Sequence, residues 1–274
     1  MKANVESAIR AARRGDGEPL AALPKLGAAV VPHLVPYLSD PDVSIRRLVV
    51  SVFSAIGGRP AAGAVADALR DKDPDIQERA AAAVYQFDRP GEIVGDARHA
   101  EALRASVEGS NHAAAAVLLL GYAPGQASLA LLRKLERLPP ERRTKLHPWA
   151  EAVPVSLVAT VASSRLGDGP ARLALLEALE HASTEVYAFL LGVVRDIDDP
   201  SVLHALAKAL HDDREIGGGV PSVAEPRRRV CDAAVDALAD RLRLPVRFAR
   251  KPAARYGAQE IEEVRKLIRT SIPS

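Results

Sequence analysis

Two copies of a short motif constrain the fold of this chain more than any other feature. Asp-Pro-Asp-Val occupies residues 40–43 and Asp-Pro-Asp-Ile occupies residues 73–76, and an apolar, alanine-rich segment follows each copy. A recurrence of about thirty residues, without the alternation typical of strands, indicates helical hairpins that stack on one another. Proline fits the first positions of a helix because its missing N–H would have no acceptor there. We therefore expect Asp40 and Asp73 to cap the helices that follow.

The apolar spacing of the second copy recurs along the chain. Ile76, Ala80, Ala83, Val84 and Phe87 lie on one face of a helix. This spacing is apolar throughout in two other segments, and three more segments match it except at one position each. The segments that fit it, and so are predicted to form the second helix of a hairpin, begin near residues 45, 76, 113, 155, 186 and 230. Leucine spacing predicts the matching first helices near residues 30–38, 65–69, 102–103, 129–135, 173–179 and 203–210.

These patterns predict an all-α protein, a right-handed α-α superhelix of about six helical hairpins with terminal capping helices. We expect one continuous domain, in which residues 1–25 and 244–274 are the caps and residues 26–243 are the repeats. Composition agrees, because 48% of the residues are hydrophobic and only 4% are aromatic.

Net charge, cysteine content and apolar segments give no sign of a polyanionic partner, a disulfide or a membrane. A net charge of +2 is too small to indicate a polyanionic partner, and a single cysteine excludes an intrachain disulfide. The longest apolar run, 113–121, is too short to cross a bilayer, and the first residues lack the apolar stretch of a secretory signal. We expect a cytoplasmic monomer that has no contact with membranes.

The Asp-Pro-Asp openings, Arg46 after Ile45 and the alanine-rich second helices resemble HEAT repeats, specifically the short repeats of phycobilisome-lyase-like proteins. The resemblance covers most of residues 28–243. Tetratricopeptide repeats have a similar period, but their tryptophan, glycine and tyrosine pattern is missing here. The resemblance implies scaffolding and partner binding more often than chemistry. The phycobilisome lyases attach bilins, but a shared repeat does not transmit that activity. We therefore expect a protein that is not an enzyme and has no cofactor.

The candidate binding residues are those that the second helices leave unburied, because these helices line the concave face of such an array. They are Arg47, Glu78, Gln86, Asn111, Tyr122, Trp149, Arg228, Asp232 and Asp236. This set begins basic and polar and becomes acidic toward the last repeat, which suits a protein partner better than a nucleic acid. The alternative is that these are ordinary solvated surfaces, with Trp149 as a packing residue.

Two basic clusters leave nucleic-acid binding open, including a role like that of the HEAT-like DNA glycosylases. Their members are Arg133, Lys134, Arg137, Arg142, Arg143 and Lys145, and Arg243, Arg247, Arg250, Lys251 and Arg255. Residues 227–229, all arginine, open the last second helix, where positive charge is unfavourable, so an acidic neighbour or a ligand should compensate. The glycine-rich loop 212–225 is expected to be either a flap beside the groove or a plain insertion.

Catalytic and metal sites have little support in the sequence. Cys231 lies beside Asp232, but it occupies a packed position and no basic neighbour is apparent to activate it. His204 and His211 are too far apart to hold a metal ion without a third ligand, so we expect no metal. The interpretation is a protein-binding scaffold or adaptor, or an inhibitory or immunity-type binder, that engages its partner through the concave face.

Overall fold

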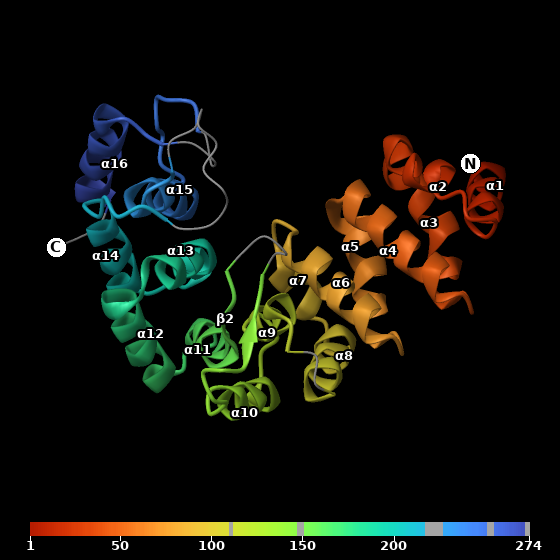
Figure 1. Cartoon of the computed structure of the whole chain (residues 1–274), viewed down its shortest axis with the longest axis horizontal. Coiled ribbons are helices and arrows are strands. Elements are labelled where there is room, and N and C mark those ends of the chain that lie inside the picture. The colour runs from red at the N-terminus through yellow and green to blue at the C-terminus, as the bar shows by residue number, and fades with distance from the viewer. Residues whose placement is uncertain (110–111, 147–150, 217–226, 251–254, 272–274) are drawn as a thin grey trace. The chain divides into compact units, whose positions relative to one another are not determined.

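The structure is built from helices. It is a computed structural model that describes residues 1–109, 112–146, 151–216, 227–250 and 255–271 (Figure 1). Its α-helices are α1 (Lys2–Ala12), α2 (Glu18–Ala21), α3 (Val31–Leu34), α4 (Val43–Ile56), α5 (Gly58–Asp67), α6 (Pro74–Tyr85), α7 (Pro90–Val94), α8 (Ala97–Glu108), α9 (Ala114–Leu120), α10 (Gln126–Leu135), α11 (Val155–Arg165), α12 (Gly169–His181), α13 (Thr184–Val193), α14 (Pro200–Ala209), α15 (Val230–Leu242) and α16 (Ala258–Ser271). The 3-10 helices are η1 (Leu23–Val30), η2 (Val35–Ser39), η3 (Ala68–Arg70) and η4 (Val194–Asp196). The all-α prediction is confirmed.

The predicted helices of the repeats are all present. The second helices correspond to α4, α6, α9, α11, α13 and α15, and α1 and α16 form near the two ends. The first helices correspond to α5, α8, α10, α12 and α14, whereas the earliest one is broken into η1, α3 and η2. Pro32 and Pro36 follow the starts of α3 and η2, and because proline has no N–H to donate, the segment is divided at these points.

The chain divides into two compact units, Met1–Leu138 and Pro139–Ser274. In the first unit α4 packs on α5 and α6, and α6 packs on α9. In the second unit α11 packs on α12, and α15 packs on α13, α14 and α16. The helices of the fourth predicted hairpin, α10 and α11, belong to different units. A single continuous domain stays a prediction.

The buried face of α6 is the predicted one. Ile76, Ala80 and Val84 have no exposed surface, and Ala83 is 5% exposed, whereas Phe87 at the end of the pattern is only partly buried. Burying such a face against its neighbours stabilises each helix by about 25 cal/mol per Å² of apolar surface removed from water.

The prediction for the helix caps is correct at α6 and wrong at α4. Asp73 accepts hydrogen bonds from the backbone N–H groups of Asp75 and Ile76, at 3.0 and 3.2 Å, and therefore caps α6. At α4 the cap is Asp42, which accepts from Ser44 N at 2.8 Å. Asp40 lies outside the helix.

Arg13 and Arg46 explain why Asp40 does not cap α4. The side chain of Asp40 is almost fully buried, and its Oδ2 accepts a bond of 2.6 Å from Arg13 Nη2, while its carbonyl accepts one of 2.8 Å from Arg46 Nη1. Arg46 also forms a two-point ion pair with Asp71, at 2.7 and 3.0 Å. The hydrogen bond with Asp71 raises the pKa of Arg46 above its ordinary value. Arg46, part of the motif that suggested the repeat, therefore ties one repeat to the next.

Two local features were not predicted. The short helix α7 follows α6, and an antiparallel pair of two-residue strands, β1 (Arg143–Thr144) and β2 (Val153–Pro154), precedes α11. In this pair Arg143 lies opposite Pro154 and Thr144 lies opposite Val153.

Candidate functional site

The predicted binding residues on α4 and α6 lie on neighbouring helices of the first unit. Glu78 is exposed and makes no ion pair or hydrogen bond within the described part of the chain. Arg47, in contrast, is engaged: it contacts Asp73 at 3.3 Å and Asp75 at 2.8 Å. Desolvation opposes ionisation of Asp73, but hydrogen bonds from the backbone and the charge of Arg47 outweigh it and lower the pKa of that carboxyl. Of these two predicted residues, Glu78 is the one left free for a partner.

Gln86 lines an open pocket of about 500 Å³ in the first unit, where α4 and α6 end and α5 and α7 begin. The apolar lining includes Ala62, Ala83 and Ile93, all buried, together with Phe87. The remaining lining residues are Ser54, Gly57, Gly58, Arg59, Asp88, Arg89 and Glu92. The pocket therefore combines an apolar interior with a rim of mixed charge.

The rim of this pocket is held by ion pairs. Glu92 lies 2.9 Å from Arg89 and 3.9 Å from Arg59, and its hydrogen bond from Arg89 lowers the pKa of the carboxyl. All three side chains are well exposed, so these pairs contribute little to stability and can exchange with charges on a ligand. Tyr122 packs close to α7, because a methyl group added at Gly91 would lie 3.4 Å from its ring.

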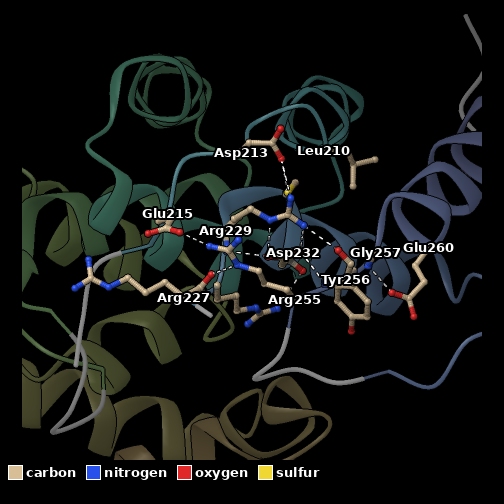
Figure 2. Close-up of polar contacts among 12 residues, drawn as sticks. Leu210, Asp213, Glu215, Arg227, Arg229, Asp232, Arg255, Tyr256, Gly257 and Glu260 are labelled. Atoms are coloured by element: carbon tan, nitrogen blue, oxygen red, sulfur yellow. Dashed lines mark hydrogen bonds and ion pairs between the residues drawn. The ribbon is translucent and has the colours of Figure 1, made fainter. Parts of the chain in front are cut away.

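In the second unit, the predicted residue Asp232 is not on the surface. Its side chain is fully buried, and its carboxylate accepts from Arg229 N at 2.8 Å, from Arg229 Nη2 at 3.0 Å and from Tyr256 N at 3.0 Å (Figure 2). The expectation that Asp232 faces a groove is therefore wrong. It is a structural acid that holds the start of α15 against the segment leading into α16.

Arg229 is the centre of this polar cluster. Besides Asp232, it contacts Asp213 at 3.1 Å and donates to the carbonyl of Tyr256 at 2.8 Å (Figure 2). The hydrogen bond with Asp232 raises the pKa of Arg229. Arg229 is thus compensated by acidic neighbours, which is one of the two explanations that the sequence left open for the arginine run.

Arg228 and Asp236 are also paired with each other rather than free. They form an ion pair, and Asp236 accepts a bond of 2.7 Å from the hydroxyl of Tyr256. Arg250 lies 2.5 Å from Asp240 and 3.8 Å from Asp236, and Arg255 pairs with Glu215. Acids of the same unit therefore pair with two of the five members of the second basic cluster, Arg250 and Arg255, which removes part of the support for the nucleic-acid alternative.

The ends of the glycine-rich loop are held together. Ile216 N donates to the carbonyl of Arg228 at 2.8 Å, and Val230 N donates to that of Arg214 at 3.0 Å, beside a bridge between Glu215 and Arg229. Residues 217–226, most of the predicted flap, lie outside the described residues. Two predicted binding residues, Asn111 and Trp149, lie outside them as well.

Cys231 lacks the surroundings of a reactive thiol. It is buried, its Sγ lies 3.4 Å from Asp213 Oδ1, and burial together with the charge of Asp232 raises its pKa to about 11. The thiolate is the nucleophilic form, so this cysteine is inert near neutral pH. Among the described residues, no group of three His, Cys, Asp or Glu side chains could hold a metal ion. None of the helices in those residues is long and apolar enough to span a membrane.

Sequence reasoning missed Arg229 as the centre of the polar cluster and missed Tyr256 altogether. The signal for Arg229 was present in the arginine run at 227–229. Nothing in the sequence near Tyr256 indicates that its backbone reaches Asp232, because the two residues are far apart in the chain.

Comparison with known proteins identifies a similar fold. No family model matches the chain, and no curated protein matches it. Among solved structures, the chain is similar to the complex of CpcE and CpcF of phycocyanin lyase from Nostoc sp. PCC7120. The TM-score is 0.56 at 16% sequence identity, and the match covers 98% of this chain and 92% of that chain. This likeness confirms the predicted resemblance to lyase-like HEAT repeats at the level of the fold.

The same finding corrects the prediction that the protein is not an enzyme. That prediction assumed that a helical-repeat architecture indicates a scaffold without chemistry, yet the similar structure is that of a lyase. That structure is also a complex of two proteins. The fold of this chain is thus one that an enzyme uses.

Proposed function

We propose that this chain is a helical-repeat subunit that binds a partner protein through the first unit, and that the pair works as a lyase-type enzyme. The proposed surface consists of the pocket beside Gln86 and the exposed positions of α4 and α6, including Glu78. The likeness to a two-protein lyase complex supports both the partner and the enzymatic role.

The observation that carries this proposal is the pocket at the ends of α4 and α6. Its volume of about 500 Å³ falls in the range of ligand pockets and exceeds the volume of any single side chain. Large apolar side chains that insert into such pockets supply much of the affinity in protein interfaces. The mixed charges of Arg59, Arg89 and Glu92 would form the polar rim around such an anchor.

Glu78 extends this surface along α6, and Ser51 and Ser54 extend it along α4. All three are exposed, and the two serine hydroxyls donate only to carbonyls of their own helix, those of Arg47 and Val50. Short side chains let a partner helix or strand approach the α4 backbone closely. The charge of Glu78, without a partner of its own, favours a basic group on the partner.

The proposal is tested by affinity capture from the native host with Ser54→Trp, which fills the pocket mouth, and with Glu78→Arg. Glu108→Trp on α8 is the matched control, because it also places tryptophan at an exposed helix position but away from the pocket. The first two variants should lose a partner that wild type and the control retain. A partner set that is identical for all four proteins would exclude this surface.

A further inference from the structure

A hollow of about 230 Å³ in the second unit is lined almost entirely by basic and apolar residues. It lies between α14 and α16, and its lining is His204, Ala207, Lys208, Leu210, His211, Arg265, Ile268 and Arg269. Five of these side chains are basic, and no carboxylate of the described residues is among them. The chain as a whole carries a net charge of only +2, so this concentration is local.

Two helix faces bring these groups together. His204 and Lys208 lie four residues apart on α14, His211 follows the end of that helix, and Arg265 and Arg269 lie four residues apart on α16. Arg265 is fixed across the gap, because it donates to the carbonyl of Leu210 at 2.6 Å.

The charge of this hollow is only partly neutralised. Glu262, 3.4 Å from Arg265, compensates that residue. Lys208 and Arg269 have no ion pair or hydrogen bond in the part of the chain that the structure describes, and both are exposed. Like charges close together repel, so an anion bound between these two residues would be stabilised by both.

A second hollow of about 320 Å³ adjoins the first and shares His204 and Lys208 with it. Leu176 and Leu179 of α12 supply apolar surface, and Tyr187 of α13 supplies a phenol. Tyr187 is only 6% exposed, and its hydroxyl has no hydrogen-bond partner among the described residues. Tyr187 lines this hollow, so its hydroxyl is available to donate to a group bound there.

Tyr187 remains a donor near neutral pH. Burial raises its pKa above the ordinary value, and the charge of Asp212 raises it further, against a smaller opposing effect of Arg214. Asp212 does not compete for the same ligand groups, because Arg214 holds its carboxylate at 2.6 and 3.0 Å. Glu180 is the remaining acid of this hollow and disfavours a second anionic group there.

We propose that the two adjoining hollows form one binding site for a phosphate monoester with an uncharged, apolar or aromatic body. The phosphate lies among Lys208, Arg265 and Arg269, and the body lies against Leu176 and Leu179 with a polar group that accepts from Tyr187. A phosphate suits this site better than a carboxylate, since its two charges and three terminal oxygens can use several cationic donors at once. The site lies outside the proposed partner surface and does not depend on it.

The test is calorimetric titration of the full chain with inorganic phosphate and with 4-nitrophenyl phosphate, whose nitro group can accept a hydrogen bond. The ester should bind more tightly than phosphate. Lys208→Gln and Arg269→Gln should each weaken both ligands about tenfold or more, as expected for a charged hydrogen bond. Tyr187→Phe should weaken only the ester, by about three- to tenfold, as expected for a neutral hydrogen bond.

Lys266→Gln is the matched control, since it removes an exposed cation from the same helix outside the hollow. Circular dichroism of each variant checks that the helices are intact. Three outcomes would overturn the proposal. The first is no binding of either ligand, and the second is that Lys266→Gln weakens binding as much as Lys208→Gln and Arg269→Gln do. The third is that the ester binds no more tightly than phosphate and its affinity is unchanged by Tyr187→Phe.

Discussion

Replacing Asp232 with alanine should strongly lower the free energy of unfolding of the second unit, although the change removes only one small side chain. The side chain is fully buried and accepts hydrogen bonds from the backbone N–H groups of Arg229 and Tyr256 as well as from the guanidinium of Arg229 (Figure 2). Its removal leaves the charge of Arg229 and two backbone donors without their main acceptor.

The magnitude follows from what is left unpaired. Breaking a buried ion pair by removing one partner costs about 3–5 kcal/mol, and each buried donor without an acceptor costs about 1–3 kcal/mol. These costs overlap, and Arg229 keeps its contact with Asp213, so we expect a loss of about 3–5 kcal/mol in the free energy of unfolding. Asp232→Asn should lose less, because its amide oxygen can still accept from Tyr256 N.

The assay is urea unfolding followed by circular dichroism, with each unit of the chain treated as a separate transition where two are seen. Asp198→Ala is the control: Asp198 pairs with Arg241 at 3.0 Å, but its side chain is fully exposed, so no measurable change is expected. If Asp232→Ala, like Asp198→Ala, unfolded at the same urea concentration as wild type, the polar cluster around Arg229 would not be holding α15 against the segment that leads into α16.

The other predictions concern single side chains. Arg46→Ala should destabilise the first unit by about 3–5 kcal/mol, because it leaves the buried carboxylate of Asp71 without its cation; an unchanged urea midpoint would refute this. Cys231, with a pKa of about 11, should react with iodoacetamide at pH 7.5 only after unfolding in urea, and rapid labelling of the native protein would contradict its assignment as inert. Asp199 caps α14. Desolvation raises the pKa of its carboxyl, but hydrogen bonds from the backbone N–H groups of Ser201 and Val202 outweigh that effect and lower it. The stabilisation by this cap is therefore present above the unfolded pKa of about 3.9 and is lost as the pH falls through the folded pKa. Asp199→Asn should flatten this acid-side loss of stability, and an identical pH profile for the variant would show that the cap does not contribute.

The features that the sequence predicted are those that depend on neighbours within one repeat. Six second helices were found because an apolar residue must recur on the buried face of each helix, as Ile76, Ala80 and Val84 do. The cap at Asp73 was found for the same reason, since its acceptors and donors lie within three residues.

The features that the sequence missed depend on partners far along the chain. Asp40 does not cap α4 because Arg13, at the other end of the preceding segment, pairs with it. Asp232 falls at a solvent position on a helical projection of α15, yet the backbone N–H of Tyr256, from the segment before α16, donates to its carboxylate (Figure 2). No local pattern carries that information.

The pairing of charges separates structural from functional candidates in this chain. Arg46, Arg172 and Arg229 each meet a mostly buried acid, with Asp71, Asp199 and Asp232 as their partners, so they hold the fold together. A second group of charged side chains lies on the open surface, where water solvates them and no pocket is required. Lys208 and Arg269 differ from both groups, because they are unpaired within the described residues and line one hollow from two helices. These two cations, beside a tyrosine hydroxyl that has no acceptor among the described residues, are therefore where a bound ligand would add the most interactions.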